Sequence, residues 1–410
     1  MRPRLLLLAF LILPLFAVEG QHHFRVLHAF GSGTDGAGIW GSVALDKRGN
    51  VYGTTSGGGT HKGGTVFRLA PGSNGRRTET VLHDFASSPD DGAGPFGGVV
   101  LDAKGNPYGT TIEGGTHNGG TIFRLVPNNG HWKEEILHNL CAKPACEDGG
   151  APWGSLAMDS SGDLYGTGYV AFELTPHLNR WSDITLHEFT GKNGDGSGPQ
   201  AGPIRDAAGN LYGTTLYGGG GPLCVDGCGT VWELEPPARG DPSAAKAWKE
   251  RILHRFGFSD NDGVWPGLGQ LAMDSEGDLY GAANGGKYGS GVVFKLARPA
   301  MGSDQKWQET ILYSFTGGAD GAVSEGVILD NTGNLLGTAA LGGSDCGCGV
   351  VFKLSPQIDG NWKYTLLHTF IGSDGAEPLA NLTFGPDGKL YGTTATGGVY
   401  GGGVVFELTP

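Results

Sequence analysis

Three aromatic residues occupy positions that carry other residue types elsewhere in a repeated pattern. Trp40, Phe96 and Trp153 each lie just before a short apolar segment that ends in Asp. The corresponding positions further along the chain are Gln200, Leu268, Ser324 and Leu379. Flat apolar rings stack well on the faces of sugars, so this row of aromatics is typical of a glycan-binding surface. The alternative is a packing role, in which the rings plug the mouth of a channel.

Polar residues near the same positions could contact a ligand. They are Gln200, Glu325 and Asn381. The sequence contains no G-x-S-x-G, H-E-x-x-H or Walker motif, and the G-x-G-x-x-G match at 31–36 leads into a strand pattern rather than a helix. We therefore expect a binding or scaffold module rather than an enzyme. The alternative is a hydrolase or lyase that acts on a carbohydrate or lactone.

Acidic residues cluster in several Asp-Gly loops, and the densest cluster is Asp260-Asn261-Asp262-Gly263. Carboxylate oxygens are the ligands that calcium prefers, although the EF-hand spacing with its closing Glu is missing. Asp260 and Asp262 are therefore candidate ligands of a structural calcium ion. Ordinary turn formation by Asp and Gly is the competing interpretation.

A Leu-His-x-Phe motif recurs along the chain, and its histidines are His28, His83, His138, His187, His254 and His368, with Tyr313 in the seventh place. A residue that is present in nearly every repeat is expected to serve structure. We predict packing and hydrogen bonding for these imidazoles. The aspartates that end the apolar segments recur in the same way and are expected to cap turns.

Six cysteines form three local pairs, Cys141 with Cys146, Cys224 with Cys228, and Cys346 with Cys348. In an exported protein these pairs predict disulfides. A zinc site is the rival interpretation, but no His or second Cys pair lies at zinc-finger spacing.

The pattern that positions these residues is a tandem repeat of about 50 to 60 residues. Segments such as Gly-Asn-Val-Tyr-Gly-Thr-Thr at 49–55 return six more times, and glycine makes up 78 of 410 residues. Each unit contains four strand patterns: an apolar segment ending in Asp (a), a Tyr-Gly-Thr-Thr strand (b), a Val-Phe-x-Leu strand (c) and a strand ending in Leu-His-x-Phe (d). Seven such units predict an all-β fold, a seven-bladed β-propeller of four-stranded blades.

The phase of the repeat predicts how the ring closes. The pattern begins with a lone d strand at 24–30 and ends with a lone c strand at 403–408. Pairing the N-terminal d strand with the C-terminal blade would complete that blade and remove two exposed strand edges.

The repeat unit Tyr-Gly-Thr-Thr…Gly-Gly…Gly-Thr-Val-Phe-x-Leu resembles the GloVer tandem repeat of "choice-of-anchor" bacterial surface proteins over residues 24–410. The resemblance implies export and an extracellular setting, and it implies no particular activity. The chain departs from that family because it ends directly after a strand pattern, without a C-terminal anchor. We therefore expect a secreted or periplasmic protein.

The N-terminus supports export. Arg2 and Arg4 precede an apolar run over 5–18, which is typical of a signal peptide over residues 1–20 and is too short to span a membrane. Residues 21–410 form the propeller domain, with no further membrane span. A net charge of −13 argues against a nucleic-acid partner. The expected partners are a glycan or an extracellular protein, bound by a monomer.

Overall fold

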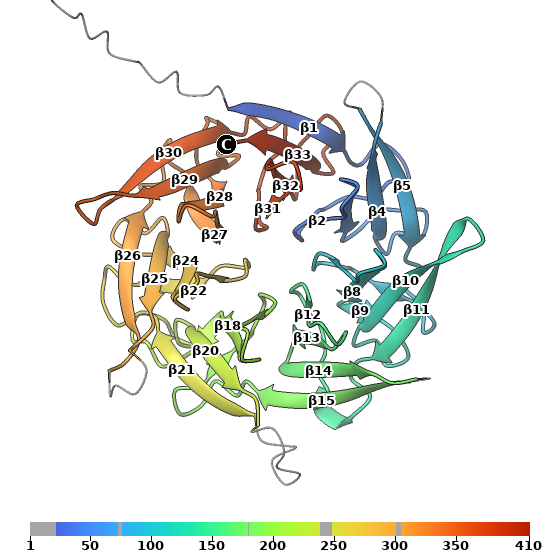
Figure 1. The fold of residues 1–410 in the computed structure, drawn as a ribbon, viewed down its shortest axis with the longest axis horizontal. Helices are drawn as coiled ribbons and strands as arrows, with labels where there is room; N and C mark the ends of the chain where they lie inside the picture. Colours follow the sequence, from blue (N-terminus) through green and yellow to red (C-terminus); the bar gives the residue numbers. More distant parts are fainter. Residues whose placement is uncertain (1–21, 73–75, 179, 238–247, 301–304) are drawn as a thin grey trace, which may run out of the picture.

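The chain folds into a ring of seven antiparallel sheets around a central axis, as Figure 1 shows. This computed structural model describes residues 22–72, 76–178, 180–237, 248–300 and 305–410. The predicted seven-bladed β-propeller is confirmed. The signal peptide expected over residues 1–20 lies outside the described residues. Within the described ranges, no helix is long and apolar enough to cross a membrane.

Each blade contains strands a to d from the axis outward, and we number the blades by the chain order of their a strands. Blades 1 to 3 are β2 (Ala44–Leu45), β3 (Val51–Thr55), β4 (Thr65–Pro71) and β5 (Arg77–Asp84); β7 (Val100–Leu101), β8 (Pro107–Thr111), β10 (Thr121–Asn128) and β11 (His131–Asn139); and β12 (Ala157–Met158), β13 (Leu164–Thr167), β14 (Val170–Pro176) and β15 (Trp181–Glu188). Blades 4 and 5 are β17 (Ile204–Arg205), β18 (Leu211–Thr215), β20 (Thr230–Glu235) and β21 (Lys249–Arg255); and β23 (Ala272–Met273), β24 (Leu279–Gly285), β25 (Val292–Ala297) and β26 (Gln308–Ser314), with β22 (Gly263–Pro266) added to β24. Blade 6 is β27 (Ala322–Leu329), β28 (Leu335–Leu341), β29 (Val350–Pro356) and β30 (Trp362–Thr369), and blade 7 is β31 (Thr383–Phe384), β32 (Leu390–Thr394), β33 (Val404–Thr409) and β1 (His23–Ala29).

Six of the seven innermost strands are shorter than the sequence predicted, and the exception is β27 with eight residues. The apolar segment 98–102 forms a strand only at β7. The residues before it use their backbone groups between blades instead, since the Gly98 N–H donates to Ser155 Oγ at 2.9 Å and the Gly97 carbonyl accepts from Thr54 at 2.8 Å. The first part of this predicted strand therefore forms hydrogen bonds to the neighbouring blades instead of pairing within its own sheet.

The ring closes as the phase of the repeat predicted. Strand β1 pairs antiparallel with β33, with Phe24 opposite Leu408 and Ala29 opposite Val404. Figure 1 shows β1 (blue) lying along β33 (red), so that segments from the two ends of the sequence share one blade. The outer edge of β33 is thereby covered.

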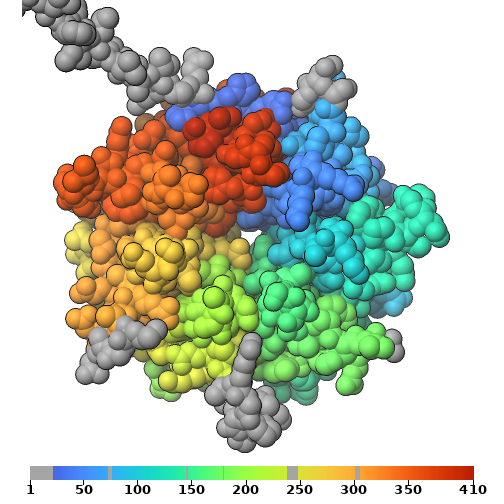
Figure 2. All heavy atoms as spheres, in the orientation of Figure 1, coloured from blue at the N-terminus to red at the C-terminus, as the bar shows by residue number. Residues whose placement is uncertain are grey.

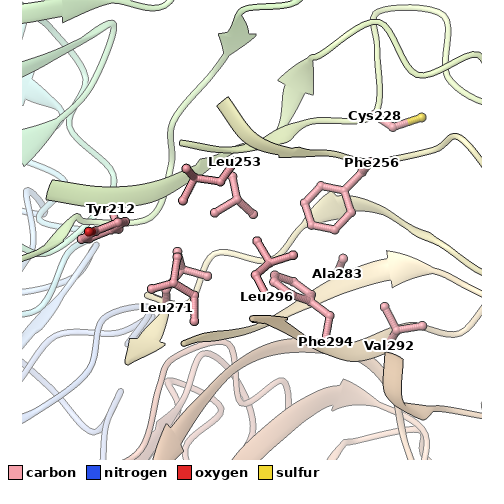
Figure 3. Close-up of a cluster of buried hydrophobic side chains, with 11 residues drawn as sticks. Tyr212, Cys228, Leu253, Phe256, Leu271, Ala283, Val292, Phe294 and Leu296 are labelled. Atoms are coloured by element: carbon pink, nitrogen blue, oxygen red, sulfur yellow. The ribbon is translucent and has the colours of Figure 1, made fainter. Parts of the chain in front are cut away.

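The hydrophobic core lies between the blades, which explains why the a and c strand patterns read as continuous apolar runs in the sequence. Figure 3 shows one of these clusters, with Tyr212 and Phe256 of blade 4 against Leu271, Phe294 and Leu296 of blade 5. The Phe256 and Phe294 rings meet edge to face with centroids 5.2 Å apart. Figure 2 shows consecutive segments of the chain following one another in contact around the ring. Each blade is thus stabilised by its two neighbours.

Candidate functional site

The d–a and b–c loops share one face of the ring, which we call the loop face. The two loop types pair with each other, as in β6 (Gly92–Ala93) with β9 (Glu113–Gly114), and β16 (Gly196–Ser197) with β19 (Tyr217–Gly218). An isolated bridge, Ala37 with Gly57, joins the same loops in blade 1. Loops of variable length held on a rigid ring are the usual place for a binding site in such a fold.

The three aromatic residues singled out from the sequence contact one another at the channel mouth, and we call them the aromatic arc. The ring centroids of Trp40 and Phe96 are 5.4 Å apart, and those of Phe96 and Trp153 are 4.5 Å apart. Trp40 and Phe96 are half-buried, whereas Trp153 is 36% exposed. The arc therefore presents a continuous apolar surface across blades 1 to 3.

The arc borders a small cavity on the axis. The rest of its lining includes Gln200, Leu268, Gln270, Leu379 and Asn381. None of the residues described as lining this cavity carries an ionisable side chain. Its volume is about 40 Å³, which accommodates a few water molecules and is too small for a sugar ring. A ligand at this site would lie across the arc rather than inside the channel.

Threonines of the Tyr-Gly-Thr-Thr motif fix the backbone of the arc from the preceding blade. The Thr393 hydroxyl donates to the carbonyl of Gly41 at 3.1 Å, and Thr54 donates to the carbonyl of Gly97 at 2.8 Å. Thr110 donates likewise to the carbonyl of Pro152 at 3.4 Å. These carbonyls flank Trp40, Phe96 and Trp153, so the repeated motif positions the residues that do not repeat.

Glycine after each aromatic allows the blades to approach closely at the axis. A Cβ atom at Gly41 would lie 2.2 Å from the backbone nitrogen of Gly98. A Cβ atom at Gly97 would lie 2.5 Å from the carbonyl oxygen of Gly154. Both distances are too short for any side chain, so the order aromatic-Gly is a steric requirement of the narrow channel.

A backbone position just before each arc position is left-handed in every blade. It is occupied by Gly38, Gly94, Ala151, Gly198, Trp265, Val323 and Glu377, with φ between 44° and 75°. β-Branched and bulky residues are strained in this conformation, so Val323 and Trp265 are the unusual members, and the aromatic one is Trp265. Its N–H donates to the Cys228 carbonyl at 2.7 Å, its carbonyl accepts from Asn284 Nδ2 at 3.0 Å, and its side chain is 41% exposed. Sequence reasoning missed this residue, although its alignment with Gly38 could have revealed it.

The predicted polar residues occupy two different environments. Gln200 and Asn381 line the cavity, and the Asn381 amide donates to the carbonyl of Gln270 at 3.0 Å. Glu325 is buried behind the lining, where Oε2 accepts the N–H of Leu268 at 3.0 Å. Burial raises the pKa of Glu325 to about 7, and the hydrogen bond from Leu268 opposes this shift. The structure therefore brings amides, but no pair of carboxylates, to the mouth.

Exposed apolar side chains gather on the loop face. Of the seventeen large apolar side chains exposed among the described residues, eleven lie in the d–a or b–c segments and a twelfth, Leu341, ends the b strand that leads into one. They are Trp153, Tyr169, Tyr217, Leu223, Val225, Phe258, Trp265, Tyr288, Leu341, Ile371, Val399 and Tyr400. An exposed apolar surface of this kind typically marks an interaction site.

The recurring histidines have the structural role that the sequence indicated. Each lies at a seam, by which we mean the junction between the d strand of one blade, the following d–a loop and the d strand of the next blade. At the seam of blades 1 and 2, His83 packs edge-on against Phe85 and bonds through Nε2 to Asp91 Oδ1 at 3.1 Å. Asp91 in turn accepts the N–H of Ala86 at 2.7 Å. The Asp of the Asp-Gly loops is therefore an anchor of its own loop.

The aspartates at the ends of the a segments cap turns. Asp46 Oδ1 accepts the N–H groups of Arg48 and Asn50, both at 2.9 Å. The same arrangement recurs at Asp102, Asp159, Asp206, Asp274 and Asp330. Burial raises the pKa of Asp46, but the hydrogen bonds from Asn50 and its neighbours outweigh it and the net shift is downward.

The cysteines and the predicted metal ligands also have clear places. Disulfides join Cys141 to Cys146, Cys224 to Cys228, and Cys346 to Cys348, the three pairs that the sequence indicated. Of the two candidate calcium ligands, Asp262 lies at a seam beside His254 and Glu309. Asp260 is not part of that group. A calcium site built from Asp260 and Asp262 stays a prediction.

Three known structures are similar to this chain at low sequence identity. A protein of Thermus thermophilus described as an oxidoreductase (glucose dehydrogenase) is 16% identical, with a TM-score of 0.44 over 95% of this chain and 100% of that chain. A luciferin-regenerating enzyme is 14% identical, with a TM-score of 0.48 over 95% of both chains. The PQQ-bound aldose sugar dehydrogenase of Streptomyces coelicolor is 14% identical, with a TM-score of 0.44 over 94% of this chain and 98% of that chain.

Comparison with curated proteins gave no match. The Gloeobacter/Verrucomicrobia repeat model, in contrast, matches residues 15–171 and 227–410, which together are most of the chain. The matched ranges contain both the b and the c strands of five blades, namely blades 1, 2, 5, 6 and 7. The chain therefore belongs to the Gloeobacter/Verrucomicrobia repeat family.

Proposed function

We propose that this chain is an exported binding module that recognises neutral glycans across the aromatic arc on its loop face. The observation that carries the proposal is the contact of Trp40, Phe96 and Trp153 around an uncharged mouth, with Trp153 exposed. Export is supported by the apolar run over 5–18 and by three disulfides, which form in oxidising compartments.

The chemistry of the mouth favours a neutral sugar. The C–H faces of a sugar ring stack on aromatic faces, and the amides of Gln200 and Gln270 across the mouth can bond to hydroxyl groups. The chain carries a net charge of −13, which disfavours polyanionic glycans. An extracellular protein is the other partner class that an apolar loop face could accept.

Catalysis is the second candidate, and Glu325 is the residue that would support it. A hydrolase or lyase needs an acid and a base placed about the reacting bond. Glu325 has a raised pKa but is 6% exposed and lies behind Leu268, and none of the residues described as lining the mouth carries a second carboxyl group. Binding is therefore the better-supported function, and any glycan that binds should also be tested for turnover.

A thermal-shift screen against neutral glycans tests the proposal. A ligand that binds the folded state at 100 times its Kd adds about 2.7 kcal/mol of stability and raises the Tm. We expect one glycan class to raise the Tm, and Trp153→Ala and Trp40→Ala to abolish the shift. Phe384→Ala is the matched control, because Phe384 is an exposed aromatic at the a–b side of blade 7. A folded protein that no glycan shifts, or a shift that survives in both Trp variants, would contradict glycan binding at the arc.

A further inference from the structure

The seams between blades contain a set of side chains that the proposed binding function does not use. Each seam combines a d-strand His or Tyr, the Asp of the next loop, and a residue on the d strand of the following blade. The seven sets are His28, Asp35 and Glu79; His83, Asp91 and Glu134; His138, Asp148 and Asp183; His187, Asp195 and Glu250; His254, Asp262 and Glu309; Tyr313, Asp320 and Tyr364; and His368, Asp374 and Phe24.

Three seams bring one imidazole nitrogen and two carboxylate oxygens within 4.8 Å of one another, namely those of His83, His187 and His254. At the His187 seam, Nε2 lies 3.4 Å from Asp195 Oδ1 and 3.3 Å from Glu250 Oε1. At the His254 seam, Nε2 lies 3.4 Å from Asp262 Oδ1 and 3.5 Å from Glu309 Oε1.

These distances suit ligands of a tetrahedral zinc ion. Zinc binds nitrogen and oxygen at roughly 2.0–2.2 Å, so two of its ligands lie about 3.3 Å apart. The His83 seam has similar spacing, with Nε2 3.1 Å from Asp91 Oδ1 and 3.7 Å from Glu134 Oε2. Calcium instead prefers six to eight oxygen ligands, so a set that includes an imidazole favours a transition ion.

The glutamates supply a second, independent observation. Oε1 of Glu134, Glu250 and Glu309 is buried and has no hydrogen-bond partner among the described residues, and the same holds for Oε1 of Glu79 at the His28 seam. The side chain of Glu134 is only 9% exposed. A buried carboxylate oxygen without a partner costs stability, and a cation between the three side chains would remove that cost.

The aspartates are held in place as metal ligands usually are. Oδ2 of Asp91, Asp195 and Asp262 accepts a backbone N–H from Ala86, Thr190 and Phe258 respectively, at 2.7, 2.7 and 3.2 Å. In each case Oδ1 is the oxygen that faces the imidazole. Such outer contacts orient a ligand before the ion arrives.

We propose that the His83, His187 and His254 seams are zinc sites that join neighbouring blades, each with three protein ligands and a fourth position open to water. A neutral imidazole and two carboxylates supply the −2 charge that balances Zn²⁺. The other seams differ: among the described residues, the side chains of His28, Asp35 and Glu79 do not form a group within 4.8 Å, and the Tyr313 seam has two tyrosines and one acid. Lys143 Nζ lies 3.2 Å from Asp183 Oδ2 at the His138 seam, and Phe24 stacks on His368 at 3.6 Å in place of an acid.

Equilibrium dialysis against zinc chloride, followed by metal analysis, tests the proposal on protein without an oligohistidine tag. We expect three zinc ions per chain, one at each of the His83, His187 and His254 seams. Glu134→Gln, Glu250→Gln and Glu309→Gln should each remove one ion, and the triple variant should remove all three. Asp374→Asn is the matched control, since it alters a seam with Phe24 in place of the acid and should leave the number unchanged.

Two results would overturn the proposal. One is the failure of the folded wild-type protein to take up zinc, which would leave the seams as hydrogen-bonded contacts between blades. The other is a zinc content that does not fall in the Gln variants, which would assign the ions to exposed histidines such as His61. Circular dichroism of each variant checks folding, and if the triple variant unfolds, the three single variants decide the question.

Discussion

Thr54 of blade 1 donates its hydroxyl hydrogen to the carbonyl oxygen of Gly97 in blade 2, at 2.8 Å. Gly97 directly follows Phe96, the central ring of the aromatic arc. The bond therefore joins two blades and fixes the backbone beside a candidate ligand contact. The residues that recur from blade to blade therefore stabilise the ring, and the residues that differ between blades line the mouth of the channel.

Replacing Thr54 with Val should destabilise the protein. Thr54 is 1% exposed, so its loss leaves the Gly97 carbonyl without this partner in a buried place. We expect the free energy of unfolding to fall by about 1–3 kcal/mol, measured by urea denaturation. Thr80→Val is the control, because Thr80 is exposed on β5 and the change there should stay within about 0.5 kcal/mol. Equal effects at the two positions would show that the inter-blade bond contributes nothing.

Replacing Trp265 with Gly should have the opposite effect on stability. The left-handed backbone at φ 49° costs a bulky residue more than it costs glycine, which the equivalent position in blade 1 uses. We expect a gain of about 0.5–1 kcal/mol, measured by thermal and urea unfolding. A gain would also identify Trp265 as a residue kept at a cost to stability, which is typical of a functional surface.

Tyr169→Gly is the matched control for Trp265. Tyr169 is an exposed aromatic on the same face, at 58% exposure, and its φ is not positive. Glycine should therefore destabilise the protein there by about 0.5–1 kcal/mol through the entropy of the unfolded chain. If both substitutions destabilise to the same extent, the strain argument for Trp265 is wrong.

The fold was more predictable than the site, for a physical reason. The same strand pattern occurs seven times, so an irregular copy does not obscure the prediction. The unpaired strands at the two ends of the repeat match each other, and pairing them closes the ring without leaving an exposed strand edge. The arc could be predicted because the repeat provides an alignment within one chain. In contrast, the contact between Glu134 and His83 could not be predicted from the sequence around either residue, because it is formed between two blades. Trp265 aligns with Gly38 of blade 1, so the repeat could have indicated a left-handed position there, and the dihedral angles establish it.

Glu325 should make stability depend on pH. Its pKa is about 7 in the folded protein, compared with 4.5 for a solvated glutamate. At a pH between these two values, the folded protein therefore keeps a proton on Glu325 that the unfolded chain has released. The stability that this proton provides is present below about pH 4.5 and is lost as the pH rises through 7. The loss is on the order of 3 kcal/mol.

Glu325→Gln isolates this effect. Its amide oxygen can still accept the Leu268 N–H and it has no charge to bury. The variant and the wild-type protein should be similarly stable near pH 4.5, and the variant should be the more stable above about pH 7. Urea denaturation between about pH 4.5 and pH 7 measures the difference in the free energy of unfolding between the two proteins. The other titrating groups are the same in both proteins, so their contributions cancel in this difference. A difference that stays constant with pH would show that Glu325 does not titrate as the structure indicates.

Removing β1 should break the ring. Phe24, Val26 and Ala29 pack against the cluster that contains Phe370 and Phe406, and β1 covers the edge of β33. Full burial of a Phe or Val side chain contributes roughly 1.5–3 kcal/mol, so even the partly buried Phe24 and Val26 represent a noticeable share of the 5–15 kcal/mol that typically stabilises a domain. A chain that begins at residue 30 should therefore unfold at a lower urea concentration than the full chain. Alternatively, it should associate through the free edge of β33, which light scattering would detect as a higher molecular mass. The control begins at residue 22 and should remain monomeric.

A peptide of residues 22–29 should restore the truncated chain by adding the missing strand, whereas a scrambled peptide should not. A truncated chain that stays monomeric and equally stable would mean that the pairing of the two ends does not close the ring.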